Sequence, residues 1–426
     1  MKKRVFRKFS YIECDDFAAF LNKKAKEGWH FKGWKLGLIF EQGEPENAEY
    51  VVDVFTNGSN MDTKPEANTK EFAEYCEAAG WKFIDSNQKF CVFKKIDENA
   101  EDIVTTEERF KNAGREELKN AFVSFVGQFL IALMYVPRFI FEDFYYQIFN
   151  NVILFIIIGF LFSVFYRFGY FIKVAIWYFQ TKKVLYCEKL YLGIGEEKQR
   201  KRYWRNVGFI VLWEAVLIVA LAMAVELRSA FYVLVSLMLL VICMYLIEYL
   251  RPSRSEHVLS IIGVSIMVPV ILVCMLFGED FKEKTYTDKN LVPFVQEDYK
   301  EMDYKFENVE YNIVSNVFGQ YKDYNVTYYK VNENTKEERE HIQYLIMESD
   351  YKWVIDHCWK TLTKDFDGYK DCARKWGAIH AFRDGEWIEF DYVRYDNQIF
   401  ILKFEDELTQ EQIDIIRKKA GLGQVM

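Results

Sequence analysis

Two apolar stretches decide the fold of this chain: AFVSFVGQFLIALMYV, from Ala121 to Val136, and VILFIIIGFLFSVFY, from Val152 to Tyr166. About 20 apolar residues are enough for a helix to cross the roughly 30 Å of bilayer hydrocarbon. Three further apolar segments follow at Val207–Val225, Ala230–Leu250 and Val258–Phe277. The sequence therefore predicts α+β soluble domains flanking a multi-pass α-helical membrane bundle of about five transmembrane helices.

The predicted domain boundaries follow from these segments. They give a cytoplasmic domain over residues 1–97, a linker over 98–120, a transmembrane block over 121–278 and an extracytoplasmic domain over 279–426. The net charge is −4 over residues 1–118, +6 over 119–278 and −10 over 279–426. Positive charge is therefore concentrated around the membrane block.

The distribution of basic residues predicts the orientation. The connector Arg167–Arg205 contains ten Lys and Arg residues, and basic residues next to membrane spans are retained on the cytoplasmic side. With five spans, we expect a cell-membrane protein with a cytoplasmic N-terminus and an extracytoplasmic C-terminus. The aromatic and basic stretch Arg167–Lys183 is expected either to lie along the inner surface or to extend the second span. The connector would then contact anionic lipid of the bilayer.

The N-terminal domain reads as strand, helix, strand, strand, helix, strand. We expect a first strand at Val5–Tyr11, a helix that ends at Gly28, strands at Trp29–Glu41 and Ala48–Phe55, a helix that ends at Gly80, and a final strand segment at Lys82–Lys95. The apolar residues of the first helix, Phe17, Phe20, Leu21 and Ala25, recur at helical spacing. This order predicts a ferredoxin-like, split βαβ domain with an exposed sheet face or edge.

The two halves of this domain repeat one another. Gly28-Trp29 and Gly80-Trp81 each follow a predicted helix at the same spacing. Glycine permits the left-handed conformation that ends a helix. We expect both glycines and both tryptophans to be structural, with each indole closing the edge of the core. The alternative is that an indole stacks on a ligand.

Several strings in this region resemble a known family. They are EGWHFKGW at Glu27–Trp34, LIFEQGEPENAEYVVDVF at Leu38–Phe55, AAGWKFI at Ala78–Ile84 and CVFKK at Cys91–Lys95. Together they are similar to the domain-of-unknown-function family DUF2812. The resemblance implies a bacterial membrane protein with this domain at its N-terminus, often encoded beside a PadR-type transcriptional repressor. It implies no catalytic residues.

Glu214 is the notable ionisable residue within a predicted span. A carboxyl group at this depth is costly and is treated as a functional candidate. It could serve a transport pathway, or it could face the interior of the helix bundle in a protonated or hydrogen-bonded form.

The C-terminal region predicts an α+β domain with an antiparallel sheet. We expect a strand at Asn325–Val331, one or two helices over Lys336–Leu362, and strands near Ala378–Phe382, Trp387–Arg394 and Gln398–Phe404. Thr409 and Gln412 have the spacing of a capping box for a last helix.

The chemistry that these residues offer is limited. Cys358 and Cys372 could form a disulfide on the extracytoplasmic side, or both could be buried thiols. With His357 and His380 they make poor metal spacing, so no metal or cofactor is expected. No nucleotide loop or catalytic set is present in the sequence.

These observations favour a membrane regulatory or sensor protein. Its extracytoplasmic domain would be coupled to a cytoplasmic domain that binds a protein partner. We expect no direct contact with nucleic acid, because the N-terminal domain is acidic. The alternatives are an accessory subunit of a membrane transport complex and a membrane enzyme of unassigned chemistry.

Overall fold

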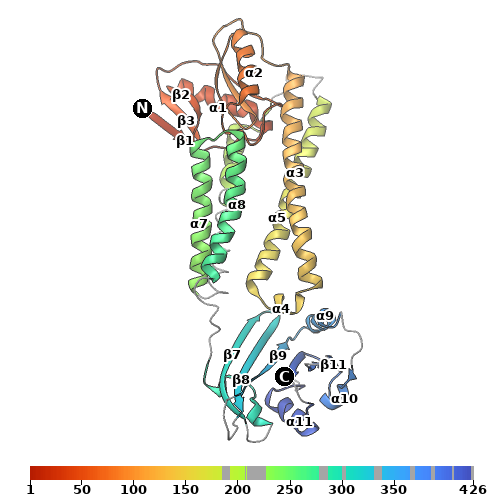
Figure 1. Cartoon of the computed structure of the whole chain (residues 1–426). Coiled ribbons are helices and arrows are strands. Elements are labelled where there is room, and N and C mark those ends of the chain that lie inside the picture. Colours follow the sequence, from red (N-terminus) through yellow and green to blue (C-terminus); the bar gives the residue numbers. More distant parts are fainter. Residues whose placement is uncertain are drawn as a thin grey trace. The chain divides into compact units, whose positions relative to one another are not determined.

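The computed structural model describes residues 1–184, 192–206, 208, 227–277, 286–299, 304–330, 338–364, 370–384, 389–404 and 407–423. The chain forms two compact units. Unit 1 consists of Met1–Leu130 and Phe160–Gly278, and unit 2 consists of Ile131–Gly159 and Glu279–Met426. The helices are coloured along the chain in Figure 1.

Unit 1 begins with two successive β-α-β-β repeats. The first contains β1 (Lys2–Val5), α1 (Cys14–Lys26), β2 (Trp29–Trp34) and β3 (Leu38–Gln42), and the second contains β4 (Tyr50–Val54), α2 (Ala67–Ala78), β5 (Trp81–Asn87) and β6 (Phe90–Lys95). Each repeat forms its own three-stranded antiparallel sheet, with the orders β1-β3-β2 and β4-β6-β5. The last strand of each repeat is therefore the central strand.

The two repeats also share an irregularity. The pairing of β2 with β3 shifts register between Phe31 and Gly33, and that of β5 with β6 shifts between Phe83 and Asp85. Phe31 follows Gly28 in the sequence by the same number of residues as Phe83 follows Gly80. The internal repeat expected from the sequence thus extends to the position of a β-bulge.

The predicted ferredoxin-like sheet is wrong. The region predicted as one strand, Trp29–Glu41, contains a hairpin between β2 and β3. Leu36 and Gly37 both have positive φ values, 52° and 101°, which reverse the chain there. Each repeat therefore closes a separate sheet. The first strand also lies at Lys2–Val5 instead of Val5–Tyr11, because β1 pairs with β3 at these residues.

Helix α1 has the buried face that its sequence predicts. Phe17, Phe20, Leu21 and Ala25 are all buried and pack in one core with residues of the first sheet. Phe9 stacks on Phe17 with 4.4 Å between ring centroids. A 3₁₀ turn, η1 (Tyr11–Glu13), leads into the helix.

Long helices follow the repeats. They are α3 (Thr106–Phe141), α5 (Asn151–Val184), α7 (Leu227–Leu250) and α8 (Arg254–Phe277), and the short helix α4 (Phe144–Gln147) lies between α3 and α5. Residues 196–206 are also helical. In Figure 1, α7 and α8 form a hairpin of which one end lies beside the first sheet.

The prediction of about five transmembrane helices is wrong. Among the described residues, two helices are long and apolar enough to cross a membrane, Thr106–Phe141 and Ile157–Lys183. Predicted span Val207–Val225 lies outside the described residues apart from Gly208. Met238–Leu250 in α7 is a shorter apolar stretch among the described residues.

Unit 2 is built on one large antiparallel sheet. Its strands are β7 (Tyr304–Asn316), β8 (Gly319–Lys330), β9 (Glu338–Glu348), β10 (Lys370–Asp371), β11 (His380–Asp384), β12 (Glu389–Arg394) and β13 (Gln398–Phe404). They follow the order β10-β11-β12-β13-β9-β8-β7. The helical elements around the sheet are η2 (Lys289–Leu291), η3 (Gln296–Asp298), α9 (Lys352–Leu362), α10 (Ala373–Trp376) and α11 (Gln410–Lys419).

Strand β9 corrects the helix predicted from Lys336. Ile342, Tyr344 and Ile346 of β9 are buried in the core on one face of the sheet. Met347, the next residue, is buried in the core on the other face. This alternation is the period of a strand. Strand β13 and the capping box between Thr409 and Gln412 are confirmed.

The sheet of unit 2 separates two hydrophobic cores. One core contains Tyr344 and Phe400 and is covered by α10 and α11. The other contains Met347 and Ile399 and includes residues of α9, of α4 and of the adjoining ends of α3 and α5. The turn between the two apolar helices is therefore part of the core of unit 2.

Candidate coupling interfaces

Gly28 and Gly80 occupy equivalent helix ends. Their φ values are 77° and 90°. A Cβ atom on Gly28 would come within 2.9 Å of the carbonyl oxygen of Gly43, and one on Gly80 within 2.9 Å of Cβ of Asp97. Both positions therefore require glycine for backbone conformation and for space.

The two tryptophans differ in their surroundings. Trp81 is 1% exposed, and its indole Nε1 donates to the carbonyl oxygen of Glu101 at 2.9 Å. Trp29 is only partly buried, and Nζ of Lys3 lies 5.2 Å from its ring centroid. The larger contribution to packing is expected from Trp81.

The structure does not bring Cys358 and Cys372 together. Both are buried and unbonded. Cys358 lies in the core that contains α9, and Cys372 lies in the core on the opposite face of the sheet. Burial raises the pKa of the Cys372 thiol to about 12 and that of Cys358 further. Both thiols are therefore held neutral and shielded. Glu214 lies outside the described residues.

The start of α1 binds the chain that follows α5. The carboxylate of Asp16 accepts hydrogen bonds from the backbone N–H groups of Ile194, at 2.6 Å, and of Gly195, at 3.1 Å. Asp15 accepts from the N–H of Leu192 at 2.6 Å. Asp16 is 2% exposed. Two carboxylates thus fix the backbone of residues 192–195.

The residues next to α1 bind α3, α5 and the helix 196–206. Glu117 of α3 is buried and accepts from the backbone N–H of Tyr11 at 2.7 Å and from the hydroxyl of Tyr170 in α5. Glu13 is fully buried and forms an ion pair with Arg202. Helix α3 and the helix 196–206 therefore contact the 3₁₀ turn η1 directly, and α5 joins them through Glu117.

Aromatic packing joins α3 and α5 to the same core. Phe110 is 1% exposed and lies 5.2 Å, centroid to centroid, from Tyr178 and 5.8 Å from Trp177. Ala113 is fully buried beside them. A Cβ on Gly114 would come within 2.8 Å of Tyr178. The first turns of α3 and the last turns of α5 are thus integral to the first repeat.

The second repeat binds the loop between α7 and α8. Arg251 has a φ of 51° and makes a bidentate ion pair with Asp85, with Nη1–Oδ2 and Nη2–Oδ1 distances of 2.7 and 3.0 Å. Its Nη2 also donates to the carbonyl oxygen of Ser86 at 2.6 Å, and its Nε donates to that of Thr63. Asp85 Oδ2 accepts in addition from the N–H of Trp34, at 2.9 Å. Asp85 therefore connects both repeats to this loop.

A second arginine strengthens the same contact. Arg254 Nε and Nη2 donate to the two carboxylate oxygens of Asp62 at 2.6 and 2.9 Å. Asp62 is 1% exposed, and hydrogen bonding to it raises the pKa of Arg254. Nδ1 of His257 lies 2.8 Å from the carbonyl oxygen of Met61. The loop is therefore held by two bidentate Arg–carboxylate pairs, which fix orientation as well as position.

In unit 2, the turn between α3 and α5 packs on α9. The ring of Phe144 lies 4.3 Å from that of His357, edge to face, and Phe144 is 5% exposed. Nε2 of His357 lies 2.7 Å from the carbonyl oxygen of Ile140. Nδ2 of Asn316 donates to the carbonyl oxygen of Ile148 at 2.9 Å. Polar and apolar contacts thus hold both helix ends on the C-terminal domain.

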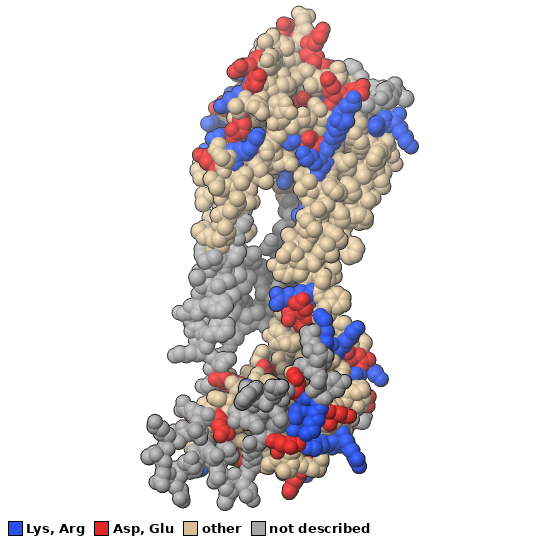
Figure 2. All heavy atoms as spheres, turned by 45° about the vertical axis from the view of Figure 1, so that its right-hand side comes forward, with Lys and Arg blue, Asp and Glu red and all other residues tan. Residues whose placement is uncertain are grey.

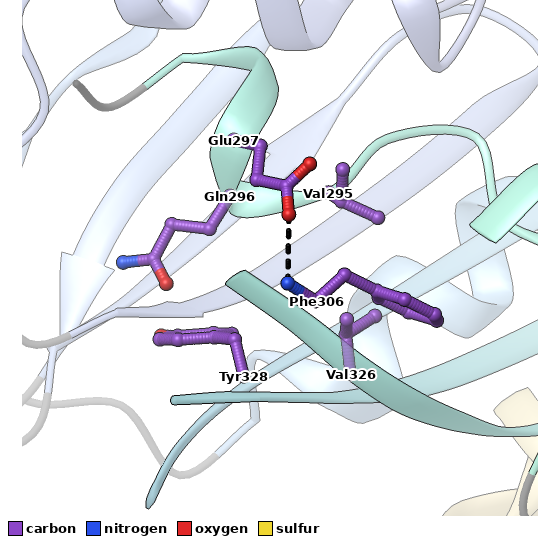
Figure 3. A pocket seen from close by; sticks show the side chains of 6 residues that line it. All are labelled: Val295, Gln296, Glu297, Phe306, Val326 and Tyr328. Atoms are coloured by element: carbon purple, nitrogen blue, oxygen red, sulfur yellow. Dashed lines mark hydrogen bonds between the residues drawn. The ribbon is translucent and has the colours of Figure 1, made fainter. Parts of the chain in front are cut away.

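Two cavities lined by described residues are small. One of about 70 Å³ is lined by residues that include Asp102, Arg109 and Leu192, whereas ligand pockets measure about 300 to 1,000 Å³. A depression in unit 2 is shown in Figure 3, where Glu297 accepts from the backbone N–H of Phe306 at 2.7 Å. It leaves no volume that a water molecule could occupy. Neither accommodates a substrate. No group of three potential metal ligands is found among the described residues.

The comparisons with known proteins address the first unit. Residues 14–126 match the family model described as protein of unknown function (DUF2812). This match confirms the resemblance inferred from the sequence. It ends within α3, and so the DUF2812 region includes the turns that carry Phe110 and Glu117. No curated protein and no solved structure matches the chain.

Sequence reasoning missed the residues that form these interfaces. Asp85 and Asp62 stand in polar stretches that resemble any solvated turn. Their partners Arg251 and Arg254 follow the predicted span Ala230–Leu250, where basic residues are expected to mark the cytoplasmic side. The sequence offers one signal for this contact: Asp85 lies at a β-bulge, and Arg251 and Arg254 lie in the seven-residue connector 251–257. Only the fold shows that these residues are in contact.

Proposed function

We propose that this protein is a membrane-bound regulatory protein in which α3 and α5 couple the C-terminal domain to the DUF2812 region. The proposal is carried by the continuity of α3, a single helix of 36 residues. Its Phe110 belongs to the core of the first repeat, and its Phe139 belongs to a core of unit 2. A rigid secondary-structure element that contacts two sites can carry energetic coupling between them.

The exposure of the helix shafts supports insertion into a membrane. Large apolar side chains are highly exposed on both helices, including Met134 at 73% and Phe165 at 71%. An apolar surface of this kind is stable in lipid and unfavourable in water. In Figure 2, the described shafts of these helices carry almost no acidic or basic side chains on the face in view.

We further propose that the DUF2812 region is cytoplasmic and that the C-terminal domain is extracytoplasmic. The basic residues next to the DUF2812 region favour the cytoplasmic side. If α3 and α5 cross the bilayer, the turn that contains α4 lies on the opposite side. The C-terminal domain packs on α4, so it would lie on that side as well.

The DUF2812 region would act by binding a cytoplasmic protein. A PadR-type regulator is the first candidate, because the family resemblance implies such neighbours. Helix α2 offers an exposed surface, on which Tyr75 is 71% exposed. No observation on the described residues favours the accessory-subunit or the enzyme hypothesis.

A photo-crosslinking residue at Tyr75 tests this function in native membranes. The full-length protein should form an adduct with a cytoplasmic protein, and the adduct yield should change when Phe144→Ala loosens the C-terminal contact. Val317→Ala is the matched control, since Val317 is 78% exposed in unit 2. An adduct yield that is the same in all three proteins would contradict coupling, and absence of any adduct would contradict the partner at this surface.

A further inference from the structure

The last turns of α5 have one unpartnered face. Val174 is 2% exposed and Trp177 packs on the DUF2812 core. Ile172, Ile176 and Phe179 lie on another face, at a spacing of four and three residues, and are 38%, 51% and 60% exposed. Beyond this apolar stripe come Lys182 and Lys183, both exposed. Apolar residues that end in cations match the boundary between lipid tails and headgroups.

The helix 196–206 shows the same division. Gln199 is buried and its Nε2 donates to the carbonyl oxygen of Lys8 at 2.7 Å, while Arg202 pairs with Glu13. Other residues of this helix point away from the core: Lys198, Arg200, Lys201, Trp204 and Arg205 are all exposed. Trp204 is 62% exposed. Tryptophan is enriched at membrane interfaces.

The helix 196–206 is held on the 3₁₀ turn η1 by the ion pair of Arg202 with Glu13. Helix α5 is held there through α3, because Tyr170 donates to Glu117, which accepts from the N–H of Tyr11. Both helices and their outward cations therefore belong to unit 1, with the DUF2812 region. Within the described chain, no carboxylate forms an ion pair with Lys182, Lys183 or Arg205. Lys201 pairs with Glu197, at 2.7 Å. The surplus positive charge is available to an external anion.

We propose that the outward faces of α5 and of the helix 196–206 bind the headgroups of anionic phospholipid. The ligand class follows from the combination of exposed apolar side chains, an exposed indole and unpaired cations next to a helix that is apolar enough to cross a membrane. Binding would hold the DUF2812 region against the inner surface. This inference rests on the membrane insertion proposed above and not on the regulatory role.

The test is native mass spectrometry of the full-length chain in a nonionic detergent, titrated with phosphatidylglycerol or with phosphatidylcholine. The wild type should retain phosphatidylglycerol more tightly. The variant Lys182→Gln/Lys183→Gln/Arg205→Gln should lose affinity for it by about fivefold for each charge removed. Its affinity for phosphatidylcholine should not change.

A matched control removes three exposed lysines of unit 2, in the variant Lys352→Gln/Lys360→Gln/Lys418→Gln. It should bind both lipids as the wild type does, and thermal unfolding should show that both variants are folded. Equal affinity of the wild type for the two lipids, or no loss in the first variant, would overturn the proposal. Tight binding of a single-stranded oligonucleotide to the nanodisc-embedded wild type, lost in that variant, would assign the surface to nucleic acid and also overturn it.

Discussion

Replacing Arg251 by alanine should release the loop between α7 and α8 from the DUF2812 region. The side chains of Arg251 and Asp85 are 19% and 9% exposed. Removing one partner of a buried ion pair costs about 3 to 5 kcal/mol, because the other charge stays buried. Asp85 keeps two backbone donors, the N–H groups of Trp34 and Ser86 at 2.9 Å each. We therefore expect the contact between the loop and the DUF2812 region to lose about 3 kcal/mol of stability, the lower end of that range.

Amide hydrogen exchange of the full-length protein in nanodiscs measures this loss locally. A loss of about 3 kcal/mol corresponds to exchange that is about a hundredfold faster in residues 251–257 and 61–64. Lys32→Ala is the control, because Lys32 and Glu41 form a surface pair with side chains 55% and 43% exposed. Such pairs contribute at most about 1 kcal/mol.

The double variant Arg251→Ala/Asp85→Asn separates the cost of the buried charge from the cost of the lost contacts. It should exchange more slowly than Arg251→Ala alone, because no unpaired carboxylate remains. Exchange in Arg251→Ala that equals the Lys32→Ala control would refute the role of this pair. If the loss of stability in the double variant equals the sum of the losses in Arg251→Ala and Asp85→Asn, the electrostatic explanation is refuted.

Three other results are expected. Trp81→Ala should destabilise the DUF2812 region by about 3 to 5 kcal/mol and Trp29→Ala by less, as measured by chemical unfolding of the full chain; equal losses would contradict the difference in burial. Cys358 and Cys372 should resist alkylation in the native protein and react after unfolding, and a disulfide-linked peptide in the mass spectrum would disprove the free thiols. Burial raises the native pKa of Asp53 above its ordinary value of 3.8, so its ionisation destabilises the fold as the pH rises above that value; Asp53→Asn should raise the melting temperature at neutral pH, and this gain should vanish in acid.

Local patterns predicted the parts of the fold that depend on neighbouring residues. The apolar spacing of Phe17, Phe20 and Leu21 defined the buried face of α1, and Gly28 marked its end. The pair Thr409 and Gln412 defined the start of α11. These features follow from helix geometry and capping, which act within a few residues.

The pairing of strands could not be predicted in the same way. β1 pairs with β3 across α1, so that Lys2 lies opposite Glu41, and no local pattern specifies such a contact. The non-glycine residue Leu36 adopts a positive φ in the hairpin, which sequence patterns rarely predict. Strand β9 was mistaken for a helix because its polar first half masks the alternation at Ile342 and Tyr344.

The interfaces depend on contacts that are still more distant in the sequence. Asp85 and Arg251 are 166 residues apart, and Glu13 and Arg202 are 189 apart. In the sequence, a basic residue beside an apolar segment indicates only membrane topology. This pattern could not show that the two arginine side chains are directed to buried carboxylates, because that requires the packing of the complete unit.

In the proposed function, α3 and α5 couple the C-terminal domain to the DUF2812 region. The direct test is amide hydrogen exchange of the nanodisc-embedded protein with the substitution His357→Ala, which removes the contact to the carbonyl oxygen of Ile140. If the helices couple the two domains, amide exchange should change in residues 106–117 of α3 and in residues 11–16, while β13 stays protected. Altered exchange confined to unit 2, with residues 11–16 and 106–117 identical to the wild type, would contradict it.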